Sequence, residues 1–301
     1  MNDLKSIVNS KAHAAVLVAN FIFGVNFSAV KFITPSLISP IALNVTRVLV
    51  SLFLFWILFL LKPHKAGIQK KHYWRFILCG ATGVAINQVL FIKGVSLTTS
   101  IHSSLLILIT PILITFFAAW LIKEALSLNK FIGLILGITG AMFLILMKEN
   151  NQHATNIILG DTFIVLNAIS YAFYMVLVKP LMEVYSPIHV LRWVFAFGTI
   201  MILPFGYNDF LNTQWALLEF KSWSALLFII IGATFFTYLF TIYGINKIGA
   251  AATGSYIYTQ PIFAAAIAII FMGEHLHLQK IIAAVFIFGG VYLASKKTKP
   301  L

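Results

Sequence analysis

Uncharged apolar stretches of about 20 residues recur from end to end of this sequence, and they limit its fold more than any other feature. Each is long enough for a helix to cross roughly 30 Å of hydrocarbon. Of the 301 residues, 60% are hydrophobic and only 10% are charged, whereas about a quarter of an average soluble domain is charged. Most of the chain is therefore expected to face lipid. We expect membrane spans at 11–33, 40–61, 74–94, 100–121, 128–147, 160–181, 187–206, 222–244, 250–272 and 278–295.

Little of the chain lies between these stretches. The longest connections, near 62–73 and 206–221, are too short for a soluble domain. The sequence contains no phosphate-binding GxxxxGK motif that would drive primary active pumping. We therefore expect an all-α membrane protein with ten transmembrane helices, no soluble domain and no cofactor.

The positive charges are distributed unevenly among the connections. A formal net charge of +13 on a soluble protein would suggest a nucleic-acid partner. With the N-terminus inside, however, 14 of the 21 Lys and Arg lie on the cytoplasmic side, five on the outer side and two within spans. This bias follows the positive-inside rule. We predict a multi-pass protein of the cell (inner) membrane, embedded in the lipid bilayer, with both termini cytoplasmic and no nucleic-acid partner.

The second half of the chain repeats a pattern of the first. The stretch TPILITFFAAWLIKE, which ends on Glu124, has a counterpart in QPIFAAAIAIIFMGE, which ends on Glu274. Pro111 and Pro261 stand 13 residues before these glutamates, so both pairs are separated by 150 residues. We therefore divide the chain into two repeats.

Each repeat, 1–150 and 151–301, contains five of the expected spans. Because five is an odd number, the second repeat must enter the membrane in the opposite sense to the first. Inverted repeats are a recurring build of secondary transporters, whose halves surround a site near the bilayer midplane. Duplication alone is weaker evidence for transport, since channels are also built from duplicated halves.

Four segments resemble the EamA-type branch of the drug/metabolite transporter superfamily. They are SPIALNVTRVLVS (39–51), INQVLFIKGVSLTTSIHSSLLILITPILITFFAAWLIKEALSLNKFIGLILGITGAMFL (86–144), GDTFIVLNAISYAFYMVLVKPL (160–181) and GSYIYTQPIFAAAIAIIFMGEHL (254–276). The doubled mid-helix proline followed by glutamate is the strongest part of the resemblance. The resemblance implies ten helices, cytoplasmic termini and export of small metabolites, often amino acids or related compounds. It does not identify the substrate.

Polar side chains spaced by three and four residues indicate which helix faces line a cavity, because polar groups in hydrocarbon are costly unless they face protein or water. Such a face occurs in the sixth span with Tyr171 and Tyr174, and in the eighth with Thr234 and Tyr238. The alternative is hydrogen bonding between helices, worth about 0.6 kcal/mol per group. We predict that the substrate-binding residues are Asn20, Asn87, Gln88, Tyr171, Tyr174, Tyr238, Tyr256 and Gln260.

The two repeated prolines and glutamates have separate predicted roles. Pro111 and Pro261 free backbone groups near the midplane, so we predict that they are hinges. Glu124 and Glu274 are predicted to mark the cytoplasmic and outer rims, where each holds a turn or gates against the opposite half. Arg47, about 10 Å into the second span, is grouped with them as a rim or gating residue, and binding of an anionic substrate group stays open for it.

Two further features have less specific interpretations. Arg192 lies about 7 Å into the seventh span, so its side chain is expected to extend to the headgroups. The sequence EHLH at 274–277 brings a carboxylate and two imidazoles together. Because no third distant ligand is evident, we interpret it as a solvated loop and not as a metal site.

Three classes of function remain to be compared. The leading one is a secondary transporter that moves a small, largely neutral or zwitterionic molecule outward by alternating access. An intramembrane enzyme would need His102 to activate Ser103 or Ser104, and the sequence places no acidic residue beside them to orient the imidazole; we predict that the protein is not an enzyme. A channel is the other alternative, although no ring of charged residues is evident. The oligomeric state is not predicted.

Overall fold

The computed structural model is helical throughout the residues that it describes, which are 2–61, 67–122, 128–146, 154–248, 253 and 256–295. No strand occurs within these ranges. Seven helical stretches in them are long and apolar enough to cross a membrane, and three shorter apolar helices accompany them. The all-α membrane class is thus confirmed, while the count of ten spans stays a prediction. The seven are Ser10–Ile33, Pro40–Leu61, Lys70–Leu97, Ser100–Phe117, Ile157–Val184, Pro187–Asn212 and Phe220–Gly244.

The helices of the first repeat begin with a long N-terminal helix that precedes the expected start of the first span. In chain order they are α1 (Asn2–Ile33), α2 (Pro40–Leu61), η1 (Lys70–His72), α3 (Tyr73–Gly80), η2 (Ala81–Ala85), α4 (Ile86–Leu97), α5 (Ser100–Leu106), η3 (Ile107–Ile109), α6 (Thr110–Ile122) and α7 (Leu128–Leu146).

The helices of the second repeat follow the same succession of long and broken elements. They are α8 (Ile157–Val184), α9 (Pro187–Asn212), η4 (Trp215–Leu217), α10 (Phe220–Leu227), η5 (Phe228–Phe236), α11 (Thr237–Ile248), η6 (Tyr256–Thr259), α13 (Gln260–Met272) and α14 (Leu278–Ser295). Ser186 begins α9 by accepting from the His189 N–H at 3.4 Å, with Pro187 at the first helical position, where its missing N–H removes no helical bond.

Irregular turns interrupt the helices at related places in the two repeats. The third and eighth expected spans contain the π-helical segments η2 and η5. The 3₁₀ turns η3 and η6 come just before the two repeated prolines. A proline lacks the N–H for a helical bond, and its ring clashes with the carbonyl four residues earlier, so the preceding turn departs from α geometry. The sequence repeat is therefore accompanied by repeated local geometry.

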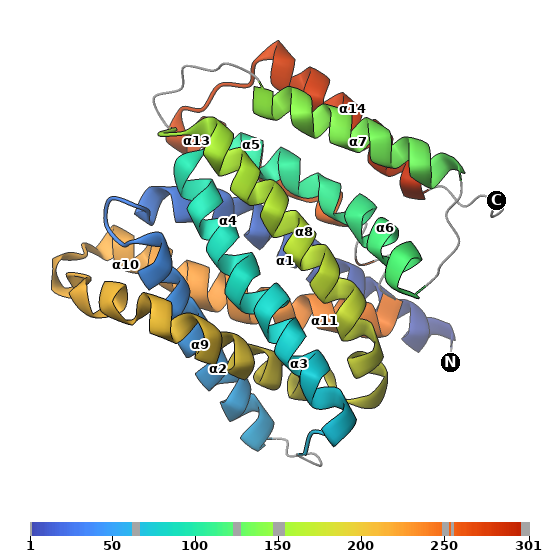
Figure 1. Ribbon diagram of the computed structural model, residues 1–301, viewed down its shortest axis with the longest axis vertical. Coiled ribbons are helices and arrows are strands. Elements are labelled where there is room, and N and C mark those ends of the chain that lie inside the picture. The colour runs from blue at the N-terminus through green and yellow to red at the C-terminus, as the bar shows by residue number, and fades with distance from the viewer. Residues whose placement is uncertain are drawn as a thin grey trace.

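Helices of the two repeats pack against each other across the molecule. The pairs α7 and α14, α2 and α9, α4 and α8, and α1 and α11 make extensive contacts, and Figure 1 shows α7 and α14 side by side at the top of the view. Gly290 allows α14 to pack closely on α7, because a Cβ there would lie 2.6 Å from the Gly133 carbonyl oxygen. Most helix contacts therefore join one repeat to the other.

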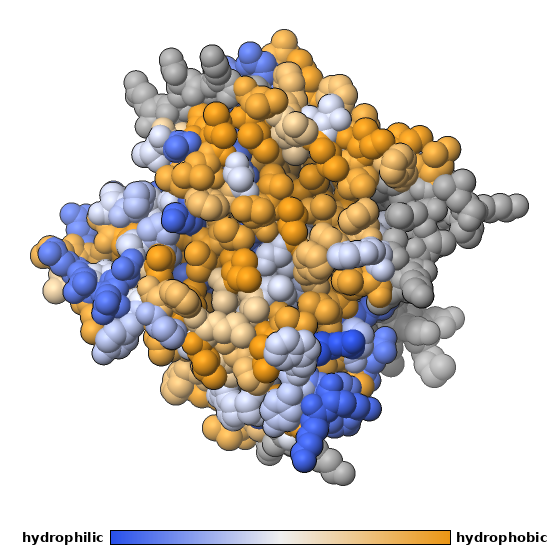
Figure 2. Space-filling model, viewed as in Figure 1, coloured by the Kyte–Doolittle hydropathy of each residue, from blue (hydrophilic) through white to orange (hydrophobic). Residues whose placement is uncertain are grey.

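The surface has the distribution expected of a membrane protein. On the face seen in Figure 2, hydrophobic residues cover the middle, and hydrophilic residues gather at the left edge and at the lower right. The beginning of α1 and the end of α14 both lie toward the right of the same view in Figure 1. A hydrophobic belt between two polar regions is the pattern that a bilayer requires.

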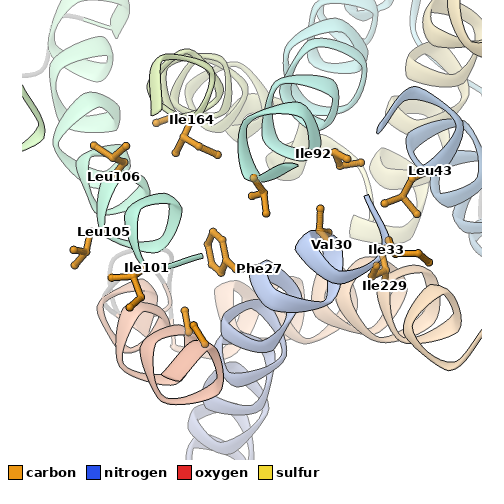
Figure 3. Packing of buried hydrophobic residues seen from close by; sticks show 14 of the residues in the cluster. Phe27, Val30, Ile33, Leu43, Ile92, Ile101, Leu105, Leu106, Ile164 and Ile229 are labelled. Carbon is orange, nitrogen blue, oxygen red and sulfur yellow. The ribbon is translucent and has the colours of Figure 1, made fainter. Parts of the chain in front are cut away.

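The largest buried cluster forms where α1, α4, α5 and α8 meet (Figure 3). Phe27 points between α1 and α5 beside Ile101, and its ring meets Phe91 edge-on with centroids 5.4 Å apart. Ile92 and Ile164 bring α4 and α8 into the same cluster. This packing holds together the helix ends at which Thr98, His102 and Asp161 lie buried.

Candidate functional site

A buried carboxylate at the start of α8 binds the junction between α4 and α5. Asp161 is fully buried. Thr98 Oγ1 donates to one of its carboxylate oxygens at 2.5 Å, and His102 Nδ1 lies 2.8 Å from the other. Gly160 permits the approach, because a Cβ there would be 2.6 Å from the Thr98 nitrogen. Both oxygens of this carboxylate therefore have partners.

A second buried carboxylate caps the start of α5. Gly273 ends α13 with φ 66°, a left-handed conformation that glycine adopts readily. The turn directs Glu274 back to α5, where its carboxylate accepts from the N–H groups of Ser100 at 2.8 Å and Ile101 at 3.1 Å. These are N–H groups that a helix start leaves unpaired. Glu274 is 1% exposed, so the solvated-loop interpretation of this residue was wrong.

Lys31, in the last turn of α1, completes this group. Its Nζ donates to the carbonyl oxygens of Ser96 at 2.9 Å and Thr98 at 2.6 Å. We refer to Lys31, Thr98, His102, Asp161 and Glu274 as the Asp161 network. Its bonds join the ends of α1, α4 and α5 in the first repeat to the start of α8 and the end of α13 in the second.

A different group of polar residues surrounds Arg47 on α2. Arg47 is 4% exposed, and its Nε donates to Thr234 Oγ1 on η5 at 2.8 Å. Thr234 in turn donates to the Ile229 carbonyl at 2.9 Å, a bond within the π-helical segment. Tyr238 lies four residues after Thr234, one turn further along the same helix face. The interrupted helix thus presents a hydroxyl and a phenol to Arg47.

Several atoms of this group have no hydrogen-bond partner among the described residues. These atoms are Arg47 Nη1, Ser51 Oγ, and the amide nitrogen and oxygen of both Asn44 and Gln88. Asn44, Arg47 and Ser51 follow a spacing of three and four residues, so they occupy one face of α2. Each unsatisfied buried group costs about 1–3 kcal/mol. Such atoms are the ones expected to bind water or a polar ligand.

We refer to Asn44, Arg47, Ser51, Gln88, Thr234 and Tyr238 as the Arg47 cluster. Gln88, on α4, lies beside the Tyr238 hydroxyl without reaching hydrogen-bond geometry. The contacts of α2 with both α4 and η5 bring the cluster together. It therefore draws side chains from both repeats.

The tyrosines predicted on α8 also converge on Tyr238. The rings of Tyr171 and Tyr174 lie 5.8 Å apart, and both pack in the same buried cluster as Tyr238. Gly83, in the π-helical segment η2, lies against Tyr174, because a Cβ there would be 2.4 Å from the Tyr174 ring. Gln88, Tyr171, Tyr174 and Tyr238 are thus brought together by the fold.

Three other predicted binding residues lie between α1 and α13 or η6. The Gln260 side-chain nitrogen donates to Asn20 Oδ1 at 2.7 Å. Tyr256 is 2.8 Å from His13 Nδ1 through its hydroxyl. Asn20 and Gln260 therefore hold α1 and α13 together by a buried amide pair, apart from the bonds of the Arg47 cluster.

Asn87 and Asn167 join α4 to α8 by a reciprocal pair of bonds. Each side-chain nitrogen donates to the backbone carbonyl of the other residue, at 3.2 Å from Asn87 and 2.7 Å from Asn167.

Pro111 and Pro261 each stand at the second position of a helix, α6 and α13 respectively. Glu124 lies outside the described residues. Within the described ranges no three His, Cys, Asp or Glu side chains are grouped as metal ligands.

Arg192 does not extend to the headgroups as expected. It is 1% exposed, and its guanidinium lies 3.3 Å from the ring centroid of Phe59 and 4.8 Å from that of Trp56. Its Nη2 is 3.0 Å from His189 Nδ1. Aromatic rings of α2 thus hold the side chain inside the bundle by cation–π contact, which the position of Arg192 in its own helix did not reveal.

Sequence reasoning missed functional candidates in both groups. Asn44 and Ser51 were overlooked, although the spacing test used on the sixth and eighth spans would have placed them on one face with Arg47. The sequence predictions give Asp161 no role. Its bond to His102 joins residues 59 positions apart, and no local pattern indicates such a pair.

A helical membrane bundle in which the two halves of the chain share a group of buried polar side chains has the build of a membrane transport protein. The model of the EamA-like transporter family matches residues 10–146 and again residues 158–296. The chain belongs to this family and is a multi-pass membrane transporter.

Curated relatives agree with this assignment, and a solved structure shares the fold. An uncharacterized transporter of Archaeoglobus fulgidus is 26% identical over 96% of this chain and 99% of its own length. The uncharacterized transporter YetK of Bacillus subtilis is 23% identical over 83% of this chain and 76% of its own. A crystal structure of a protein that is 16% identical covers 95% of this chain and 96% of its own, with a TM-score of 0.61. That likeness concerns the fold alone.

Proposed function

We propose that this transporter exports small metabolites, such as amino acids or related compounds, by alternating access around the Arg47 cluster. The observation that carries the proposal is the set of buried polar atoms on α2 and α4 that lack partners among the described residues. In a membrane interior such atoms are costly unless water or substrate binds them. Tyr171, Tyr174 and Tyr238 supply further polar contacts beside them.

The proposed architecture is ten spans arranged as two inverted repeats. Two observations support it. The family model matches the chain twice, and corresponding helices exchange neighbours, since α1 packs on α11 while α8 packs on α4. A two-fold axis in the membrane plane would produce this exchange. We place both termini in the cytoplasm and the protein in the cell membrane, on the basis of the uneven distribution of Lys and Arg.

With this topology, the Asp161 network lies at the outer ends of the helices. Its bonds cross between repeats, from Thr98 to Asp161 and from Ser100 and Ile101 to Glu274. We infer that these bonds close the outer end, so that substrate enters the Arg47 cluster from the cytoplasmic side. Release to the outside then requires the crossing bonds to break.

An enzyme remains the less favoured function. Asp161 does supply the acidic partner of His102 that the sequence lacked. Ser104, however, donates to the Ile101 carbonyl at 2.9 Å, and the Ser103 hydroxyl has no hydrogen-bond partner among the described residues, so neither is bonded to the imidazole. The family and the names of the relatives are those of transporters, which is consistent with a protein that is not an enzyme.

The test is substrate flux in proteoliposomes made with purified protein. A panel of amino acids and related metabolites is loaded, and efflux is followed with and without a pH gradient. We expect selective, saturable efflux that falls when Tyr171 or Tyr238 is replaced by Ala while the amount of inserted protein is unchanged. Flux that does not saturate would indicate a channel, and no flux of any compound would contradict the proposal.

The topology is tested separately, by fusing a reporter that is active only in the cytoplasm to the C-terminus. Cytoplasmic activity is expected from an even number of spans with the N-terminus inside. As a control, a second reporter that is active only outside the cell is fused to the same end. Activity of this second reporter would contradict both the ten-span count and the assignment of the Asp161 network to the outer end.

A further inference from the structure

Arg47 is a buried cation that has no carboxylate partner in the described part of the chain. Its Nε donates to a neutral hydroxyl, Thr234 Oγ1. The two buried carboxylates of the described residues, Asp161 and Glu274, bind other groups in the Asp161 network. Tyr238, one turn after Thr234, carries a phenol that is also neutral at pH 7. The Arg47 cluster therefore carries one uncompensated positive charge.

Such a charge is expensive in a membrane interior. Taking a cation out of water costs several kcal/mol even after the protein relaxes, and an opposite charge in good hydrogen-bonding geometry offsets that cost. Arg47 also keeps a buried N–H-bearing atom, Nη1, without a partner among the described residues. A guanidinium presents parallel N–H donors that fit the two oxygens of a carboxylate. The missing partner thus has a defined chemistry.

We propose that the substrate is a small organic monoanion whose carboxylate binds Arg47. This inference rests on the proposed transport around the Arg47 cluster, but its preferred substrate is an anion and not the zwitterionic amino acid named in that proposal. It also differs from the neutral or zwitterionic molecule expected from the sequence. A monoanion makes the occupied site electrically neutral. A zwitterion would leave a net charge of one in the bundle, and a cation would add to it. The site therefore ranks ligands as anion, then zwitterion or neutral molecule, then cation.

The neutral members of the cluster fit the rest of such a molecule. The unpartnered amides of Asn44 and Gln88 offer both donors and acceptors, so they bind a hydroxyl or carbonyl beside the carboxylate. Tyr171, Tyr174 and Tyr238 supply rings for an apolar or aromatic substituent. A hydroxy or oxo carboxylate with an apolar side chain matches this combination.

The test uses probes that share one skeleton and differ in charge. Lactate, alanine, lactamide and alaninamide are an anion, a zwitterion, a neutral molecule and a cation at pH 7, and their phenyl-substituted analogues form a second series. Counterflow of each labelled compound is measured in proteoliposomes, and the flux into protein-free liposomes is subtracted. We expect the anion of at least one series to move about tenfold faster than its zwitterion, which corresponds to about 1.4 kcal/mol.

Substitutions then assign this preference to Arg47. Arg47→Gln is expected to reduce anion flux about 30-fold or more, since one partner of a buried charge pair is removed. Arg47→Lys, which retains the charge, should preserve the order of preference at lower flux. Arg192→Gln is the matched control, because it also removes a buried guanidinium, and it should leave the ratio of anion to zwitterion flux unchanged.

The outcomes separate the two proposals. If zwitterions or neutral compounds move and the anions do not, the anion inference fails while the transport function stands. The same holds if Arg47→Gln keeps the preference for anions. If none of the eight compounds moves, both proposals are contradicted for molecules of this size. Should Arg47→Gln not fold, thermal unfolding of the wild-type protein decides: phenyllactate must raise its Tm more than phenylalanine does, and the reverse order overturns the inference.

Discussion

The Asp161 network and the Arg47 cluster are both buried and polar, but they differ in how their hydrogen bonds are met. In the network, each carboxylate oxygen of Asp161 and Glu274 has a partner. In the cluster, amide and guanidinium atoms of Asn44, Arg47 and Gln88 have none among the described residues. Paired carboxylates stabilise one arrangement of helices, whereas polar atoms without partners are stabilised only when something else binds them. The first is suited to closing the molecule and the second to recognising cargo.

Substitution in the network should cause the largest loss of stability. Asp161→Ala leaves Thr98 and His102 buried without their carboxylate, and we expect a loss of about 3 kcal/mol in the free energy of unfolding. Thermal unfolding of the detergent-solubilised protein measures it. Glu219→Ala, at an exposed position, is the control. A Tm equal to that of the wild type would show that the network does not hold the helix ends.

Removing the cap on α5 should cost somewhat less. Glu274→Ala deprives the N–H groups of Ser100 and Ile101 of their acceptor, for an expected loss of about 2 kcal/mol. Glu274→Gln keeps one acceptor oxygen and should restore part of the loss. Equal Tm values for the two variants would mean that the carboxylate acts only through its size.

A methyl group added beside Tyr174 should cause an intermediate loss of stability. Gly83→Ala places a methyl group 2.4 Å from the Tyr174 ring, which must move, at a cost of about 1 to 2 kcal/mol. Gly67→Ala is the matched control, because no atom lies within 4 Å of a Cβ there. Transport by the Gly83 variant should fall together with its Tm. Full activity in that variant would argue against a role for Tyr174.

In the Arg47 cluster the sign of the stability change should reverse. Asn44→Leu replaces a fully buried amide that lacks partners among the described residues with an apolar side chain of similar size. We expect a gain of about 1 kcal/mol in stability and a loss of transport. A variant that is less stable than the wild type would mean that Asn44 belongs with the paired residues.

The smallest change in stability is expected at Tyr238. Tyr238→Phe keeps the ring that packs edge-on against Phe195, with centroids 5.3 Å apart, so stability should stay within about 0.5 kcal/mol. Loss of a hydroxyl that binds substrate should reduce flux roughly 3- to 10-fold. Unchanged flux would remove Tyr238 from the binding residues and leave it as packing.

Part of the candidate site was accessible from the sequence. The three- and four-residue spacing on the sixth and eighth spans selected Tyr171, Tyr174 and Tyr238, which the fold brings together, because spacing reports which residues share a helix face. Spacing does not report which helices meet. Asn87 therefore ranked with Gln88, although Asn87 is bonded to the backbone of α8 and Gln88 lies beside Tyr238.

Contacts between residues that are far apart in the chain could not be predicted from the sequence. Glu274 and Ser100 lie 174 positions apart. From the sequence, a glutamate in a turn between two helices is expected to face water. Arg192 had the position of a snorkelling residue, but α2 covers it with Trp56 and Phe59. Burial depends on the neighbouring helix in each case.

The sequence by itself determined that this chain is a helical membrane protein, because the length and polarity of each stretch are local properties that a bilayer selects directly. Only the tertiary structure decided which buried polar groups are satisfied. Whether a polar atom has a partner depends on the helix that packs against it, and that contact joins residues on opposite halves of the chain.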